Sequence, residues 1–211
     1  DILGVSCVTS AIIQGHNVAT IAKIFNKDIV TLVGGVHVTA LPEETMTEFP
    51  NFDLGVLTEA EGSILEICTA VEEKRSPTGI RGTMYRENGK LVRAQPIAEF
   101  PDVNAIPFAN REILPMEWYN KKHTSRGVLR DVWKVAEIDS SRGCPYACTF
   151  CNVELTHGRK TRFRDPDNVL REVEQLVKKF GTNFFSVKDL ETYNILLSLI
   201  FLSTKFPKSK S

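Results

Sequence analysis

Three cysteines of the sequence lie within eight residues, in the segment Cys144-Pro-Tyr-Ala-Cys148-Thr-Phe-Cys151. Thiolates are the usual protein ligands of iron–sulfur clusters. Thiolates at this C-x3-C-x2-C spacing are expected to hold three irons of a [4Fe–4S] cluster, which leaves the fourth iron without a protein ligand. An open metal position is a place for a substrate or cofactor to bind, as it is in catalytic zinc sites.

A structural zinc site is the alternative for the same thiolates. His157 lies six residues after Cys151 and would be the fourth ligand. Zinc sites usually pair their ligands across a longer spacer, so the spacing favours the cluster. The two remaining cysteines, Cys7 and Cys68, lie in an apolar run and on the apolar side of a predicted helix, and we expect both to be unreactive core residues.

The composition excludes several classes of protein. The 211 residues are 42% hydrophobic, and 26 basic residues balance 26 acidic ones, which argues against a nucleic-acid partner. The longest apolar run, at 195–202, is shorter than the roughly 20 residues that span a bilayer. Five cysteines, three of them clustered, do not indicate a disulfide framework, so we expect a cytoplasmic protein without a membrane span.

Residues 1–75 alternate between short apolar runs and helical patterns. Runs at 1–9, 28–33 and 53–57 are typical of buried parallel strands. The helix after the first run is expected to bury the residues that share its most apolar face: Val18, Ile21, Ala22 and Phe25. A helix over 61–74 is expected to bury Ile64, Ile67, Cys68 and Val71. Three repeats of strand and helix predict a parallel sheet with right-handed crossovers.

Residues 76–131 break that rhythm, and a second unit follows. Asn88-Gly89 predicts a hairpin turn, and four prolines follow it, so we interpret this region as an ordered linker. From 132 the pattern predicts a strand, the cysteine loop, a helix and a strand at 183–187. Asp165 and Pro166 suit the start of that helix, and Gly181 suits its end. The chain begins without Met and closes after one βα repeat, so we expect truncation at both ends.

The segment Ser141-Arg-Gly-Cys-Pro-Tyr-Ala-Cys-Thr-Phe-Cys151 resembles the signature of the radical S-adenosylmethionine (SAM) superfamily. It follows a predicted strand, and barrel active sites gather at the carboxyl ends of strands. The resemblance implies a [4Fe–4S] cluster on the three cysteines, with SAM chelating the open iron. Reductive cleavage of SAM would then give a 5′-deoxyadenosyl radical that abstracts hydrogen from a small-molecule substrate. An electron donor such as flavodoxin or ferredoxin is the implied partner.

The resemblance also implies contacts to SAM from three side chains, namely Tyr146, Phe150 and Asp189. The aromatic Phe150 before the third cysteine is part of the signature. Asp189 would lie at the acidic end of the second barrel strand. The family commonly has two adjacent acids there, whereas this chain has Lys188-Asp189. No further catalytic side chain is assigned by the resemblance.

The region before the linker resembles the cobalamin-binding domain that precedes many radical SAM domains. The similar segments are Ser6-Cys-Val8, where Val8 replaces a family Leu, and Gly34-Gly-Val-His-Val-Thr-Ala-Leu-Pro-Glu-Glu44. Ser6 and the glycines would lie at the carboxyl ends of adjacent parallel strands, where ligands bind in open α/β sheets. A Gly-Gly turn alone also suits a nucleotide or a flavin, and its pairing with the cysteine motif favours cobalamin.

The resemblance assigns cobalamin contacts to five residues: Ser6, Gly34, Gly35, His37 and Glu59. Glycines allow a close approach of the backbone to a bulky ligand because no Cβ intervenes. Glu59 lies in Thr58-Glu-Ala-Glu-Gly62, which resembles a Gly-Glu-Gly-Glu segment of the family with two glycines replaced.

The prediction as a whole is an α/β chain in three parts. Residues 1–75 would be a partial, Rossmann-like cobalamin-binding domain, and 76–131 a linker with a β-hairpin. Residues 132–211 would begin a radical SAM (β/α) partial barrel. The predicted activity is cobalamin-dependent radical SAM chemistry, by methyl transfer, ring formation or a related radical transformation. The alternative is a zinc-stabilised binding module without catalytic activity.

Overall fold

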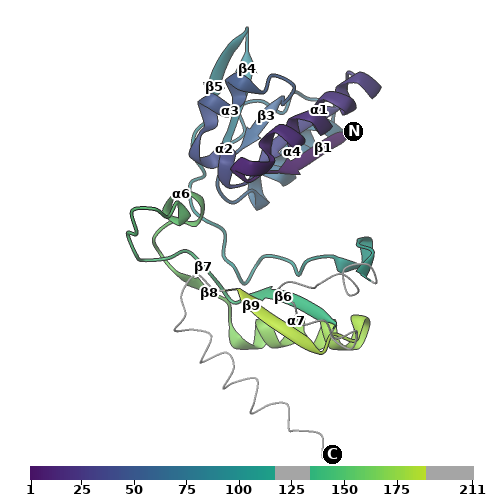
Figure 1. Cartoon of the computed structure of the whole chain (residues 1–211), viewed down its shortest axis with the longest axis vertical. Helices are drawn as coiled ribbons and strands as arrows, with labels where there is room; N and C mark the ends of the chain where they lie inside the picture. Colours follow the sequence, from purple (N-terminus) through teal and green to yellow (C-terminus); the bar gives the residue numbers. More distant parts are fainter. Residues whose placement is uncertain (117–133, 189–211) are drawn as a thin grey trace, which may run out of the picture. The chain divides into compact units, whose positions relative to one another are not determined.

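The computed structural model describes residues 1–116 and 134–188, and the fold is mixed α/β (Figure 1). The chain divides into two compact units. The first contains Asp1–Pro101 and Pro145–Arg159, and the second contains Asp102–Cys144 and the chain from Lys160 onward. The division falls within the cysteine motif, since Cys144 belongs to the second unit and the other two cysteines belong to the first.

The first unit is built on a five-stranded sheet with the order β1-β2-β3-β4-β5. Strands β1 (Ile2–Ser6), β2 (Val30–Gly34) and β3 (Leu54–Val56) run parallel. Strands β4 (Thr83–Glu87) and β5 (Lys90–Arg93) complete it in antiparallel pairing. The predicted parallel strands are therefore confirmed.

The hairpin that joins β4 to β5 turns at Asn88 and Gly89, as predicted. Both residues have positive φ, 50° and 76°, which matches the tight turn that Asn-Gly favours. We expected this hairpin in a linker, but β4 pairs with β3 and belongs to the first sheet. The reason is visible in its burial, because Met84 and Tyr85 point to opposite faces of the sheet and join the cores on both sides.

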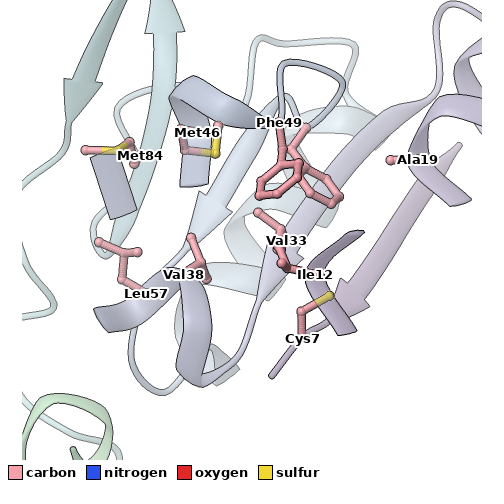
Figure 2. Packing of buried hydrophobic residues seen from close by; sticks show 10 residues of the cluster. Cys7, Ile12, Ala19, Val33, Val38, Met46, Phe49, Leu57 and Met84 are labelled. Atoms are coloured by element: carbon pink, nitrogen blue, oxygen red, sulfur yellow. The ribbon is translucent and has the colours of Figure 1, made fainter. Parts of the chain in front are cut away.

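Helices cover both faces of this sheet. After a short 3-10 turn, η1 (Thr9–Ala11), come α1 (Ile12–Phe25), α2 (Val36–Ala40) and α3 (Pro42–Glu48), and after β3 comes α4 (Glu61–Glu72). Side chains alternate along β2, so Val33 packs with α1, α2 and α3 while Leu32 packs with Ile67 of α4. Figure 2 shows the first of these cores, where Val33 and Ile12 lie beside Phe49.

The face by which α1 packs differs from the predicted one. Ile12, Gly15 and Ala19 are buried, whereas Ile21 and Phe25 are 65% and 91% exposed. The small residues face the sheet because the helix approaches it closely: a Cβ added to Gly15 would lie 2.5 Å from Sγ of Cys7. The prediction was wrong because it chose the most apolar face of the helix, and close packing selected the face with the smallest side chains.

The expectation of two core cysteines is half right. Cys7 is buried, with 3% of its surface exposed, and burial raises the pKa of its thiol. Cys68 is exposed. Of the residues predicted to be buried on α4, Ile67 is buried, and Ser63 and Ala70 are buried on the same face, which turns Cys68 outward.

The second unit contains a parallel pair, β6 (Val135–Asp139) and β9 (Phe184–Lys188), joined by α7 (Pro166–Phe180). A short antiparallel pair, β7 (Ser141–Arg142) and β8 (Arg162–Phe163), flanks the cysteine segment, and a 3-10 turn, η2 (Arg111–Ile113), precedes it. The predicted strand, helix and strand are therefore confirmed. None of the helices in residues 1–116 and 134–188 is long and apolar enough to cross a membrane.

The ends of α7 follow the sequence closely. Asp165 is the N-cap residue in an extended conformation, and Pro166 occupies the first turn. The side chain of Asp165 makes no cap hydrogen bond, and its carbonyl accepts from the N–H of Asn168 at 2.9 Å. Gly181 ends the helix with φ +63°, the left-handed conformation that glycine adopts without strain. Val169, Val173 and Leu176 then pack on Ala136 and Ile138 of β6.

Candidate functional site: a glycine crevice and a cysteine loop

The predicted residues at the ends of β1 and β2 do lie together. Ser6 is the register partner of Gly34, and the N–H of Cys7 donates to the carbonyl of Gly34 at 2.9 Å. Gly35 has φ +94°, and a Cβ there would lie 2.8 Å from Oγ of Ser6 and 2.9 Å from O of Cys7. We call Ser6, Gly34 and Gly35 the glycine crevice. Its backbone geometry requires glycine at Gly35, because both the φ angle and the space exclude a side chain.

Gly34 differs from Gly35 in having free space at the position that a Cβ would occupy. A Cβ added to Gly34 would have one neighbouring atom within 4 Å, the carbonyl oxygen of Val56 at 3.8 Å. The fold of this chain therefore does not itself exclude a side chain at Gly34. The bare backbone there fits the close approach of a bulky ligand at the carboxyl ends of parallel strands.

His37 lies beside the crevice, on α2. Its N–H donates to the carbonyl of Cys7 at 3.2 Å, and its Nδ1 lies 3.1 Å from Oγ1 of Thr9. Its side chain is largely buried. His37 thus ties α2 to the loop that follows β1, beside the glycine crevice.

The loop after β3 is the third side of the crevice. Thr58 has φ +62°, a strained value for a β-branched residue, and this position is one where the family resemblance has glycine. Its N–H donates to Oγ1 of Thr39 at 3.0 Å, and Oγ1 of Thr39 donates to the carbonyl of Gly35 at 2.9 Å. Within the described residues, the buried hydroxyl of Thr58 has no hydrogen-bond partner. The positive φ and the unsatisfied hydroxyl of Thr58 mark the loop after β3 as a strained position beside the glycines.

Glu59, the next residue, is paired with a residue that follows the cysteine motif. Its Oε1 lies 2.8 Å from Nδ1 of His157, and its side chain is 2% exposed. Sequence reasoning missed this pair, because it considered His157 as the fourth ligand of a zinc site. Nothing in the sequence connects two polar residues separated by 98 positions.

The cysteine loop presents its thiols outside the hydrophobic cores. Cys148 and Cys151 are exposed and Cys144 is half-buried. The N–H of Cys151 donates to the carbonyl of Cys148 at 3.1 Å, which folds this part of the loop into a turn. In residues 1–116 and 134–188, no three His, Cys, Asp or Glu side chains are gathered into a group that could hold a metal ion. The donor set itself, three accessible thiols in one loop, fits an iron–sulfur cluster.

The residues predicted to contact SAM have different outcomes. Tyr146 and Phe150 are 68% and 91% exposed, so neither aromatic ring contributes to the core. Asp189 lies outside the residues that the structure describes.

The second unit holds an ion network that sequence reasoning did not predict. Glu172 of α7, with a side chain 6% exposed, accepts from Arg111 at 2.9 Å and from Arg164 at 2.7 Å. The same arginines donate to two carbonyls of β6, Arg111 to that of Glu137 at 2.9 Å and Arg164 to that of Asp139 at 2.7 Å. The network therefore ties the start of η2, the segment just before α7 and the middle of α7 to the strand that leads into the cysteine loop.

This network forms one wall of a cavity of about 240 Å³ within the second unit. Other parts of the wall come from the segment before η2 and from β6 and β7, including Phe108, Glu137, Asp139 and Arg142. The guanidinium of Arg164 lies 5.6 Å from the centroid of the Phe108 ring, within cation–π range. The cavity is thus lined by both charges and an aromatic ring.

No family model matches the chain. It is 34% identical over 191 residues to a protein named an uncharacterized methyltransferase from Pyrococcus horikoshii, covering 90% of this chain and 39% of that protein. It is 33% identical over 202 residues to the anaerobic magnesium-protoporphyrin IX monomethyl ester cyclase of Rubrivivax gelatinosus, covering 90% and 34%. The chain thus spans about two fifths or less of the length of these relatives.

Two solved structures share the fold. The radical SAM methyltransferase TsrM from Kitasatospora setae, solved with tryptophan and a SAM analogue, matches with a TM-score of 0.71 at 20% identity, covering 96% of this chain and 39% of that one. The cobalamin-dependent radical SAM enzyme OxsB, solved with aqua-cobalamin and SAM, matches with a TM-score of 0.72 at 18% identity, covering 100% and 29%.

Fold and site together define an α/β protein with a parallel-rich sheet, a glycine crevice at its strand ends and a cysteine loop. The chain is therefore similar in sequence to methyltransferases and a cyclase, and it shares the fold of cobalamin-dependent radical SAM enzymes.

Proposed function

We propose that the chain is the part of a radical SAM enzyme that binds cobalamin and a [4Fe–4S] cluster, and that the enzyme transfers a methyl group or closes a ring on a small-molecule substrate. The observation that most strongly supports this proposal is the combination of the C-x3-C-x2-C loop with a glycine crevice at the ends of β1 and β2. In this proposal the first sheet is a partial Rossmann-like cobalamin domain. The second unit is the start of a partial barrel.

The residues of the chain have separate tasks in this proposal. Cys144, Cys148 and Cys151 would hold the cluster, with one iron left open for SAM. Exposed Tyr146 and Phe150 shield that position from water. When bound, the cluster and SAM supply a carbon radical and cobalamin supplies or accepts the methyl group. An external electron donor such as flavodoxin or ferredoxin would supply the electron for this chemistry.

The glycine crevice accommodates the corrin ligand in this proposal. The bare backbone of Gly34 permits close approach, and the exposed Ser6 offers a hydrogen bond to its polar groups. His37 holds α2 to the loop after β1, so the two walls of the crevice keep their spacing.

A zinc-stabilised module without catalytic activity is not favoured. The sequence relatives and structural neighbours are named as enzymes. His157, which was to be the fourth zinc ligand, directs Nδ1 at the buried carboxylate of Glu59.

Anaerobic reconstitution of the chain with iron and sulfide tests the cluster. We expect about four irons and four sulfides per chain, and a reduced cluster visible by electron paramagnetic resonance. Cys148→Ala should abolish this cluster, whereas Cys68→Ala, at an exposed position outside the motif, should not. Zinc retained by anaerobically purified protein, with no iron taken up, would contradict the proposal.

A further inference from the structure

The segment that follows the cysteine motif packs on the first unit. Helix α6 (Val153–His157) begins just after Cys151, belongs to the first unit and contacts α2. Helix α2 is the helix that starts at Gly34-Gly35. The segment that follows Cys148 and Cys151 is therefore held against α2, the helix that follows Gly35.

The end of α6 is fixed by the pair of Glu59 and His157. Their Oε1 and Nδ1 lie 2.8 Å apart, with 2% of the Glu59 side chain and 35% of the His157 side chain exposed. A buried carboxylate is costly unless hydrogen bonds compensate its lost hydration. Breaking this contact should therefore cost more than breaking an exposed pair, and the contact joins α6 to the loop after β3.

A close apolar contact adjoins the pair. Gly158 ends α6 with φ +74°, and a Cβ there would lie 2.8 Å from Cε2 of Phe100. The backbone thus passes so close to the ring that only glycine fits. Two independent contacts, one polar and one apolar, hold the end of α6 in one place.

We infer that Glu59 and His157 are a positioning pair, which holds the segment after the cysteine motif against the crevice. Through this pair, ligand binding in the crevice makes that segment more ordered. The inference rests on the proposed function for the identity of the ligand. The family resemblance implied direct contact of Glu59 with cobalamin. The inference adds to this prediction a role that Glu59 exerts through its contact with His157.

Hydrogen–deuterium exchange of the ligand-free chain tests the positioning. His157→Ala and Glu59→Gln should each speed exchange of the amides of α6 roughly tenfold, and the double variant should be no faster than either single one, because the pair acts as a unit. The matched control is Glu154→Gln. It removes the pair of Glu154, on the same helix, with Arg159 just beyond the helix end, 2.6 Å apart and with both side chains about half exposed. Exchange in α6 that is unchanged from the control in both single variants would overturn the inference.

Repeating the exchange with added hydroxocobalamin tests the coupling. Cobalamin should slow exchange of α6 in the wild-type chain, and it should not do so in His157→Ala even though the visible spectrum shows cobalamin bound. Equal slowing in both proteins, or bound cobalamin without slowing in either, would refute the coupling. A wild-type chain that binds no cobalamin would refute the proposed cofactor instead, while the ligand-free comparison would still decide whether the pair positions α6.

Discussion

Gly34 on β2 is the register partner of Ser6 on β1, yet Gly34 and its neighbour Gly35 are glycines for different reasons. Gly35 has a left-handed φ of +94° and no room for a Cβ, while Gly34 has neither constraint. The fold thus requires one glycine, and the other leaves space in front of a strand end. A substitution at Gly35 should therefore affect the stability of the fold, whereas a substitution at Gly34 should affect ligand binding.

Gly34→Ala should keep the fold and weaken the binding of cobalamin. We expect the free energy of unfolding to stay within about 1 kcal/mol of wild type, since a Cβ there has only an ordinary contact at 3.8 Å. Cobalamin affinity should fall at least about tenfold, because a methyl group now stands where the ligand approaches the backbone. Thermal unfolding and a visible-absorbance titration measure the two effects. Unchanged affinity would place cobalamin away from this strand end.

Gly35→Ala should destabilise the first unit itself. The φ of +94° and the contacts below 3.0 Å with Ser6 and Cys7 predict a loss of about 2–4 kcal/mol. Urea denaturation of the full chain measures this loss, with Gly62→Ala as the control, since a Cβ there would meet nothing within 4 Å. Equal midpoints for the two variants would show that Gly35 is not strained.

Glu172→Ala should loosen the second unit around β6. It leaves Arg111 and Arg164 largely buried without their carboxylate, so the free energy of opening of α7 should fall by about 3 kcal/mol. Native-state hydrogen exchange of α7 measures this. Glu174→Ala, on the same helix and in an exposed pair with Lys178, should cost about 0.5 kcal/mol or less. Similar losses in the two variants would mean that the network does not hold α7.

Cys7 and Cys68 should react with iodoacetamide at very different rates. The thiolate is the reactive form, and burial raises the pKa of the Cys7 thiol, so less of it is ionised at any pH below that pKa. Exposed Cys68 should be alkylated within minutes at pH 8, and Cys7 only as the chain unfolds. Mass spectrometry of the Cys144, Cys148 and Cys151→Ser triple variant isolates the two sites. Rapid labelling of Cys7 would contradict its burial.

The features that the sequence predicted correctly are local ones. The apolar runs became β1, β2 and β3, and Asn88-Gly89 and Gly181 adopted the positive φ angles that their types favour. Ser6 and Gly34 met because neighbouring parallel strands end at the same edge of a sheet.

The features that the sequence did not predict depend on contacts distant along the chain. The pairing of β4 with β3 places the hairpin in the first sheet, and nothing in the sequence of either strand indicates which strand it pairs with. The pair of Glu59 with His157 and the bonds of Glu172 to Arg111 join residues 98 and 61 positions apart. Polar residues of these types are common on surfaces, so their burial becomes visible only once the chain has folded.

The face of α1 offers a last test of how this helix packs. Phe25 is 91% exposed, so Phe25→Ser should change the free energy of unfolding by less than about 1 kcal/mol. Ile12 is 5% exposed in the core of the first unit, so Ile12→Ala should cost about 2–4 kcal/mol, from lost burial and the cavity that remains. Urea denaturation of the two variants, monitored by circular dichroism, compares them directly. If Phe25→Ser cost as much as Ile12→Ala, the face predicted from the sequence would be the buried one after all, and the close contact of Gly15 with Cys7 would need another explanation.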